Sequence, residues 1–434
     1  MLASLSRDTA TSIINALRSG TVPFDGLEHY AVGLERQMEV LREQREYVAG
    51  GHCAYKCIRG AYGSGKTFLS SLAAAEAADA KFLTSKVVIS AADTPLYKLK
   101  DVYRRFCQNL SLADRRGGAL QTLVDRWLYR LEDQVIEVDG VCEDDPDFAE
   151  VVARKVDMSL VRIGERAGRL AVTLKAYHKA KYESRFSDAR GLLDWVSGEP
   201  KVGADVKRLA SVTGQIDNTD ALVFLRGWLE LAEAAGYAGV LLVLDEVETI
   251  LRLRRPERLK SLEVLRQLID AVENQELPGL HLLITGTPDF FESSQGVPSL
   301  VPLHERIRQT HRDGEPENFR QPQITLPTLD AERLRQVATR VRAIYPAEHA
   351  ERLTKKVPDS YVLQLVDQMT AGFGGRIEVL PRLFLREFVH ILDLVDQHAD
   401  YDPAQAYRFD VAGLSELRPE EEEAIQAAGR EVLI

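Results

Sequence analysis

Residues 60–67, with the sequence GAYGSGKT, are the feature that most constrains the fold. They follow the short apolar run CAYKCI and open an alanine-rich stretch, so the pattern predicts a strand, a glycine turn and a helix. Glycines let the backbone amides of such a turn point toward one spot, and the helix adds its positive N-terminal end. A lysine and a threonine after the last glycine complete the pattern of a phosphate-binding loop. We call residues 60–68 the glycine loop.

Four further runs predict the other strands of a layered α/β domain. The run GVLLVLD, which precedes Glu246, is nearly all apolar, as in a strand buried on both faces of a parallel sheet. The others are SKVVISA, LHLLITGT and PQITLP. We expect an N-terminal arm at residues 1–24, an α/β core at 25–329 with a helical insert at about 100–220, and a helical lid and tail at 330–434.

The composition narrows the possible partners. The chain has 434 residues and a formal net charge of -11, so its total charge does not favour nonspecific binding to nucleic acid. Four cysteines are too few for a disulfide framework, and we expect Cys53 and Cys57 to be buried as small apolar residues. No apolar run approaches the roughly 18 residues of a membrane span, and we see no signal peptide. A cytoplasmic protein without a membrane partner is therefore expected.

The glycine loop predicts ATP and Mg²⁺ as cofactors. The residues expected to contact the nucleotide are Gly60, Gly63, Ser64, Gly65, Lys66, Thr67 and Phe68. Lys66 would reach the β- and γ-phosphates, and the Thr67 hydroxyl would coordinate the metal. The alternative is an ordinary glycine turn before a helix.

Two carboxylates, Asp245 and Glu246, end the apolar run GVLLVLD. A carboxylate at the tip of a buried strand can bind Mg²⁺, a role we assign to Asp245. The next carboxylate can polarise an attacking water, a role we assign to Glu246. A water-activating glutamate indicates hydrolysis and argues against a small-molecule kinase. The alternative is a strand that simply ends in polar residues.

Together these segments resemble the AAA+ ATPases, in particular their origin-recognition-like and transposition-helper branch. The resemblance covers nearly all of residues 25–397 and implies an AAA+ P-loop core with a helical lid. In that family a polar residue at the tip of the strand found here as LLITGTP orients the water. Thr287 fits this role best and Thr285 is the competitor. The alternative is that both threonines serve a turn before Pro288.

The resemblance also implies two functional arginines. PLHERIRQ lies where AAA+ proteins carry an arginine finger, for which Arg306 is the first candidate and Arg308 the second. Such an arginine reaches the γ-phosphate of a neighbouring subunit, which implies a homo-oligomer. GGRIEVLPRLFL resembles the region of the lid arginine, where Arg382 fits best and Arg376 is second. The alternative for Arg306 is an exposed helix arginine without a catalytic role.

Two further segments refine the resemblance. AVGLERQMEVL resembles the short box near the adenine, which implies base contacts from Val32 and Gly33. The long insert departs from a compact AAA+ core. Together with the other segments it is similar to a bacterial family of P-loop proteins that includes an ATPase of bacteriophage-exclusion (BREX) systems. This similarity implies a role in antiviral defence, with other defence-system proteins as partners.

The insert contains the largest charge reversal of the chain. Residues 131–150 hold nine acidic residues and no lysine or arginine, whereas residues 154–190 hold ten lysines and arginines against four acidic residues. Tyr177, Tyr182 and Phe186 lie among these cations, a pattern that suits a DNA surface. The alternative is a solvated helix face, which charge runs usually form, paired with the acidic stretch at 131–150 of the same molecule.

Two functions from different classes remain open at this stage. The first is a Mg²⁺-dependent ATPase that acts on DNA or a partner protein. The second is a nucleotide-gated switch that binds ATP, hydrolyses it slowly if at all, and recruits partners. Glu246 favours the first function. A helicase-type motor is a weaker third interpretation, because we recognise no helicase motifs beyond the core.

Overall fold

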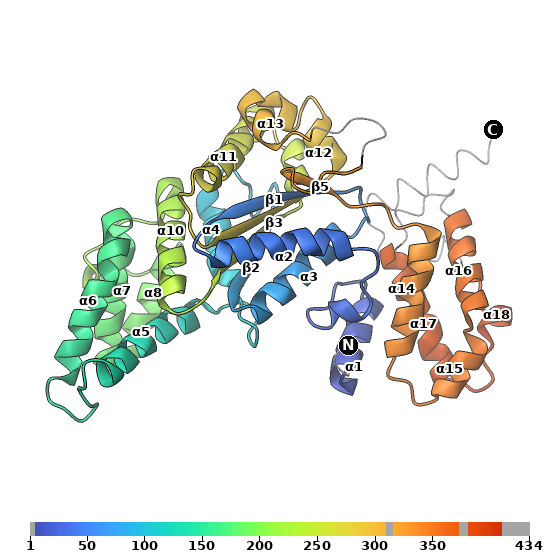
Figure 1. Ribbon diagram of the computed structural model, residues 1–434, viewed down its shortest axis with the longest axis horizontal. Coiled ribbons are helices and arrows are strands. Elements are labelled where there is room, and N and C mark those ends of the chain that lie inside the picture. Colours follow the sequence, from blue (N-terminus) through green and yellow to red (C-terminus); the bar gives the residue numbers. More distant parts are fainter. Residues whose placement is uncertain (1–4, 310–315, 373–380, 410–434) are drawn as a thin grey trace. The chain divides into compact units, whose positions relative to one another are not determined.

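The computed structural model in Figure 1 forms two compact units, and each is described by itself. The structure describes residues 5–309, 316–372 and 381–409. The first unit consists of Met1–Glu39, Ile58–Ala75 and Ile324–Ile434. The second unit consists of Val40–Cys57 and Glu76–Gln323. The domain boundaries expected from the sequence stay a prediction.

Five strands form one sheet in the order β2-β3-β4-β1-β5. Their bounds are β1 (Ala54–Arg59), β2 (Phe82–Val88), β3 (Gly239–Asp245), β4 (Leu280–Gly286) and β5 (Gln323–Thr325). The β2–β3 and β3–β4 pairs are parallel, and Val88 lies opposite Asp245 in this register. Every residue of β3 and β4 is buried. The α/β class with a parallel sheet, predicted from the apolar runs, is confirmed.

The stretch between β2 and β3 is helical and fully described. Its helices are α4 (Leu99–Asn109), α5 (Leu120–Glu137), α6 (Phe148–Arg166), α7 (Gly168–Tyr182), α8 (Phe186–Val196), α9 (Ala204–Leu209) and α10 (Asn218–Ala234). Figure 1 shows α5 to α8 grouped together, with α10 beside them. Their shared core holds the fully buried Trp127, Trp195 and Trp228. Gly227 lets α10 approach α7 closely, because a Cβ there would lie 2.5 Å from Leu170.

The remaining helices of the second unit follow the last buried strands. They are a short 3₁₀ helix (Val247–Arg252) after β3, then α11 (Arg255–Glu273), α12 (Pro288–Glu292), a second 3₁₀ helix (Val297–Ser299) and α13 (Val301–Ile307). Helices α11 and α13 lie together at the top of Figure 1. They carry the carboxylates and the arginine considered below.

The first unit is mainly helical. Its helices are α1 (Arg7–Arg18), a 3₁₀ turn (Leu27–His29), α14 (Ala331–Ile344), α15 (Ala350–Lys356), α16 (Asp359–Gly372), α17 (Pro381–Gln397) and α18 (Pro403–Ala406). An ion pair of 2.8 Å between Arg18 and Asp393 joins α1 to α17. Two helices, α2 (Glu35–Ala49) and α3 (Lys66–Asp79), contain residues of both units. Among the described residues, we find no helix with the length and apolar character needed to cross a membrane.

Candidate functional site

The glycine loop has the backbone that its glycines predict. Gly63 and Gly65 have φ values of 79° and 90°, in the left-handed region that favours glycine. At position 60 a glycine is required for a different reason, because there is no room for a side chain: a Cβ on Gly60 would lie 2.2 Å from the Ser64 Oγ. Helix α3 begins at Lys66, directly after this turn. The loop therefore brings backbone amides and a helix N-terminus together, the arrangement that binds phosphates elsewhere.

Two polar side chains of the loop face its own backbone. Lys66 is buried, and its Nζ donates to the carbonyl oxygens of Gly60 at 2.9 Å and Ala61 at 3.1 Å. The Ser64 Oγ is buried without a hydrogen-bond partner in the described part of the chain. A buried hydroxyl without a partner is costly, and a phosphate oxygen can supply one. The loop residues thus fit a polyphosphate ligand.

The segment around Val32 belongs to the same unit as the glycine loop and contacts it. The ring of Tyr30 lies 5.1 Å from the ring of Phe68, edge to face. Val32 is buried. Gly33 has a φ of 70°, and a Cβ on it would lie 3.1 Å from the Arg333 Nε on α14. Tyr30 thus places this segment beside the last residue of the glycine loop, whereas the base contacts expected of Val32 and Gly33 stay a prediction.

Asp245 is held from both neighbouring strands. Its carboxylate is 2% exposed, and its Oδ2 lies 2.8 Å from the Lys86 Nζ of β2. Thr285 of β4 donates a hydrogen bond to the Oδ1. The backbone is fixed as well, since the Ile89 amide donates to the Asp245 carbonyl at 2.8 Å. A buried carboxylate needs such partners, because an unpaired charge away from water costs several kcal/mol.

Glu246 has an unusual backbone for a residue with a side chain. Its φ of 60° and ψ of 40° lie in the left-handed region. Two hydrogen bonds hold this conformation: the Glu246 amide donates to Thr285 Oγ1 at 3.2 Å, and Thr249 Oγ1 donates to the Glu246 carbonyl at 2.9 Å. Glu246 itself is exposed. The chain therefore turns sharply where β3 ends, and it separates a buried aspartate from an exposed glutamate.

The oxygen ligands present fit a magnesium ion bound through one carboxylate. No cluster of three or more histidine, cysteine or acidic side chains that could hold a metal occurs in the described ranges. Mg²⁺ does not need one, because it binds nucleotide phosphates, waters and one or two protein oxygens. The metal-binding roles expected of Asp245 and of the Thr67 hydroxyl stay predictions.

The two threonines proposed for β4 have different surroundings. Thr285 is fully buried and bonds to Asp245 and to the Glu246 amide. Thr287 precedes α12 as its N-cap residue, without a side-chain capping bond. Thr285 thus connects β4 to the carboxylates, and Thr287 lies beyond the strand tip. The sensor role predicted for Thr287 is not decided by these positions.

Arg306 is paired with carboxylates of the same unit. Its Nε forms an ion pair with Asp270 of α11, and Glu273 lies 3.8 Å from it. Its Nη1 donates to the Pro302 carbonyl at 2.6 Å. The side chain is still 30% exposed. The alternative finger, Arg308, follows α13 as its C-cap residue.

Arg382 lies against the end of α1. A Cβ built on Gly20 would come within 3.3 Å of the Arg382 Nη1 and 3.4 Å of its Cγ. Gly20 has a φ of 65°, so it ends α1 in the left-handed conformation. Arg382 is the second residue of α17 and so lies at the start of this helix, as expected from the sequence. The alternative, Arg376, lies outside the described residues.

The basic segment of residues 154–190 is largely neutralised by the chain itself. All of its residues are described, and eight of its ten cations have carboxylate partners. The pairs are Lys155–Asp139, Arg162–Glu233, Arg169–Asp220, Lys175–Asp157, Lys179–Glu183, Lys181–Asp125, Arg185–Glu183 and Arg190–Asp194. Most of these partners lie within the segment or on α5 and α10. One pair, Lys155–Asp139, involves the acidic stretch at 131–150.

The aromatic residues of this segment differ in exposure. Tyr182 and Phe186 are each 67% exposed. Tyr177 is buried, and its hydroxyl donates to Asp125 at 2.7 Å. The expectation that Tyr177 presents its ring for stacking was therefore wrong. Its helical spacing from Leu174 and Leu170 is the sequence signal that marks it as a core residue.

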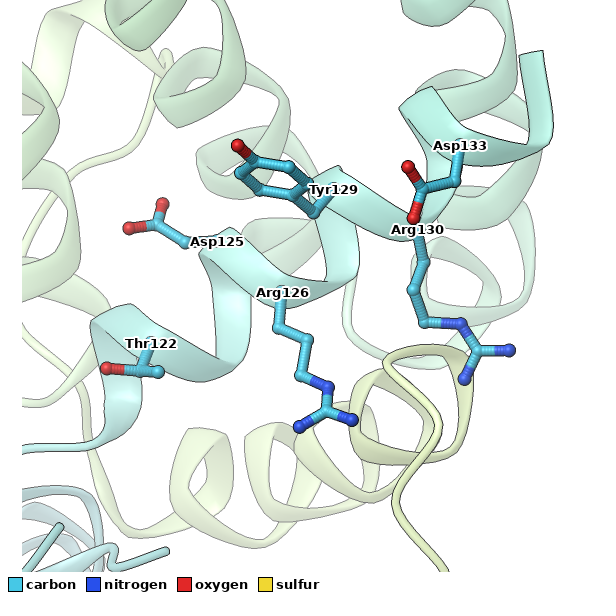
Figure 2. Close-up of a pocket in the computed structure, with 6 residues that line it drawn as sticks. All are labelled: Thr122, Asp125, Arg126, Tyr129, Arg130 and Asp133. Atoms are coloured by element: carbon cyan, nitrogen blue, oxygen red, sulfur yellow. The ribbon is translucent and has the colours of Figure 1, made fainter. Parts of the chain in front are cut away.

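A depression of about 590 Å³ lies along α5, as Figure 2 shows. Its lining residues are Thr122, Asp125, Arg126, Tyr129, Arg130 and Asp133. Asp125 accepts from Lys181 at 2.6 Å, and the Arg126 guanidinium lies 4.8 Å from the centre of the Tyr237 ring. All of these side chains come from one helix, and Asp125 and Arg126 already have partners within the chain. We therefore assign no ligand to the depression.

Sequence reasoning missed two partners of predicted site residues. Lys86 was part of a predicted strand but was given no role, although a lysine within a buried strand is itself a signal of a charged partner. Asp270, which pairs with Arg306, lies in the last turn of α11, and nothing in its own segment indicates a partner on α13. Both contacts join residues that are distant in sequence.

The comparisons with known proteins agree with these observations. A family model described as "BREX system ATP-binding protein BrxC/D" matches residues 5–411, which is nearly the whole chain. The comparison with curated proteins gives no match. The ATP-binding loop and the BREX resemblance expected from the sequence are in line with this family. The chain belongs to the BrxC/D family of BREX system ATP-binding proteins.

Proposed function

We propose that this protein is a Mg²⁺-dependent ATPase that assembles with copies of itself in antiphage defence. Its family supports ATP binding and a place in a BREX system. Hydrolysis, the metal and the assembly are the steps that the proposal adds. A cytoplasmic location is part of it, and the four free cysteines suit a reducing compartment.

Each predicted residue has a distinct task in this proposal. The amides of the glycine loop and Lys66 bind the phosphates, while Phe68, Val32 and Gly33 lie toward the base. Thr67 and Asp245 would hold Mg²⁺, which would supply positive charge to the phosphates.

Three further side chains act on the reacting phosphate. Glu246 orients and polarises the attacking water, and Thr287 or Thr285 assists it. Arg382 contributes positive charge from α17 of the same chain.

One observation carries the hydrolytic part of this proposal: the left-handed backbone of Glu246. A residue with a side chain at a φ of 60° stores strain of about 1 kcal/mol or more. Such strain persists where the surroundings impose it, and it concentrates at functional sites. Here the Thr285 and Thr249 hydroxyls impose it. An exposed glutamate fixed in this way suits a base that acts on water.

Arg306 links the activity to assembly. An arginine that reaches a neighbouring subunit's nucleotide has to leave its partners, and Asp270 and Glu273 are those partners here. An ion pair with partial exposure is worth about 1 kcal/mol or less, so a phosphate can displace it. Turnover is therefore expected to rise with protein concentration.

The test is the rate of ATP hydrolysis over a range of protein concentrations. We expect Glu246→Gln to retain ATP binding and to lower the rate by about 10²-fold or more, the usual contribution of a general base. Arg306→Ala should lower the rate and remove its dependence on concentration. A wild-type rate per subunit that is independent of concentration, and unchanged in Arg306→Ala, would contradict the shared site.

Two variants complete this experiment. Glu305→Ala is the matched control, because Glu305 is the exposed neighbour of Arg306 on α13. It should hydrolyse ATP like the wild type. Arg308→Ala examines the alternative finger, and a larger loss in Arg308→Ala than in Arg306→Ala would transfer the role to Arg308.

The second candidate function is a nucleotide-gated switch with little hydrolysis. The pairing of Arg306 with Asp270 and Glu273 favours it, since an arginine that keeps these partners would not reach a neighbouring subunit's nucleotide. Tight ATP binding with undetectable hydrolysis at every protein concentration would support the switch over the ATPase.

Action on DNA through the basic segment of residues 154–190 belongs to the same proposal. Its salt dependence gives a sharp test, because each phosphate contact to duplex DNA adds about 0.9 to the slope of log K against log salt. Arg154 and Arg166 have no carboxylate partner in the described part of the chain, so the slope expected from them alone is about 2. Fluorescence anisotropy of a labelled duplex, with and without ATP, measures it. Absence of DNA binding at low salt would remove DNA from the proposal.

A further inference from the structure

Lys86 contributes the positive charge at Asp245. The Lys86 Nζ lies 2.8 Å from the Asp245 Oδ2, while the Asp245 side chain is 2% exposed. In the β2–β3 register Val88, not Lys86, lies opposite Asp245. Lys86 therefore extends its side chain along the strands to reach the carboxylate from two residues earlier in β2.

This pairing has a direct electrostatic reason. A buried carboxylate is stable only with a compensating charge and hydrogen bonds. Thr285 supplies a hydrogen bond to the Oδ1, and Lys86 supplies a cation at the Oδ2. The same carboxylate is the proposed ligand of Mg²⁺. An ammonium group and a divalent cation repel each other, and both are attracted to Asp245.

We propose that Lys86 is a resident cation at Asp245 that competes with the divalent metal. Before a metal binds, Lys86 neutralises the buried carboxylate. When the metal binds with the nucleotide, Lys86 withdraws from Asp245. This inference rests on the proposed function, since it assumes that Asp245 binds the metal.

The structure allows this exchange without a rearrangement of the strands. The Lys86 side chain is 29% exposed, and its flexible stem can move the ammonium group toward solvent. The Thr285 hydroxyl bonds to the other carboxylate oxygen and so keeps Asp245 oriented when Lys86 leaves. Lys86 thus makes metal binding at Asp245 weaker.

The experiment measures Mn²⁺ binding by electron paramagnetic resonance, in the full chain saturated with AMP-PNP. Lys86→Met removes the ammonium group and keeps the length of the side chain. We expect Mn²⁺ to bind about three- to fivefold more tightly to this variant, the gain from removing one partly exposed competing charge. Lys86→Arg, which keeps the charge, should bind Mn²⁺ like the wild type.

The controls separate this inference from a structural role. Lys175→Met is the matched control, because Lys175 also pairs with an aspartate, Asp157, at 2.6 Å. It should leave Mn²⁺ binding unchanged. Lys86→Gln removes the charge but keeps a donor for Asp245, so it tests the same point if Lys86→Met does not fold. Unchanged or weaker Mn²⁺ binding in the folded neutral variant would overturn the inference.

Asp245→Asn distinguishes failure of the inference from failure of the proposed function. If this variant binds Mn²⁺ as tightly as the wild type, the metal is not on Asp245, and both proposals fall. If Asp245→Asn loses Mn²⁺ while the Lys86 variants behave like the wild type, the metal site stands and only the competition by Lys86 is refuted.

Discussion

Gly60 offers the most direct test of the glycine loop. A Cβ on Gly60 would lie 2.2 Å from the Ser64 Oγ and 3.2 Å from both the Ser64 Cβ and the Leu326 Cβ. The nearest contact can be relieved, because the Ser64 hydroxyl has no hydrogen-bond partner to lose when it rotates. The two carbon contacts remain. Overpacking of this kind costs about 1–3 kcal/mol, and we expect the cost of Gly60→Ala to be about 1–2 kcal/mol.

Because the loop has to keep its shape to bind phosphates, this cost should appear in the affinity for ATP. A loss of about 1–2 kcal/mol corresponds to roughly 5- to 30-fold weaker binding of a fluorescent ATP analogue. Adding Ser64→Ala removes the 2.2 Å contact and should recover part of the affinity. Gly168→Ala is the control, since a Cβ there has no atom within 4 Å. Wild-type affinity in folded Gly60→Ala would refute the argument that this packing shapes the binding loop.

Three further substitutions test the surroundings of the site. Thr285→Val removes the hydrogen bonds of Thr285 to Asp245 and to the Glu246 amide, so urea unfolding should show a loss of about 1–3 kcal/mol, and Thr285→Ser should lose less. Burial lowers the pKa of His281 to about 3, below its unfolded value, so its contribution to stability is full above about pH 6.5 and is lost as pH falls toward 3. As the pH is lowered, the melting temperature of His281→Gln should therefore decrease less steeply than that of the wild type. Gly227→Ala should lower the melting temperature, because an overpacking cost of about 1–3 kcal/mol exceeds the roughly 1 kcal/mol gain in helix propensity.

The elements with strong local signals could be predicted from the sequence. The run GVLLVLD became β3 with every residue buried, and PRLFLREFVHILDLVDQ became α17 over its whole length. The start of β2 was predicted too late, because the strand begins at Phe82. Its polar residues are paired by distant parts of the chain: Ser85 donates to the Phe106 carbonyl at 2.9 Å, and Thr84 pairs with Ser111. A buried polar strand residue of this kind has no signature in its own segment.

In the candidate site, too, the features with a local sequence pattern could be predicted, and the contacts between distant residues could not. The glycine loop and the pair Asp245–Glu246 could be singled out by their order of residues, and the roles assigned to them stay proposals. The partners that set their electrostatics could not. Lys86 meets Asp245 only because β2 and β3 are adjacent in the sheet, although more than a hundred residues of insert separate them along the chain.

Three charged groups of the proposed mechanism share one property, which bears on how activity would be controlled. Lys66 bonds to carbonyls of its own loop, Asp245 pairs with Lys86, and Arg306 pairs with Asp270. Each group therefore has to exchange a local partner for a phosphate, a metal or a neighbour's nucleotide. Each exchange replaces an existing interaction, so a single ligand gains less than its new contacts alone would suggest. Nucleotide, metal and neighbouring subunit together can complete all three exchanges, and this favours turnover only in the loaded assembly.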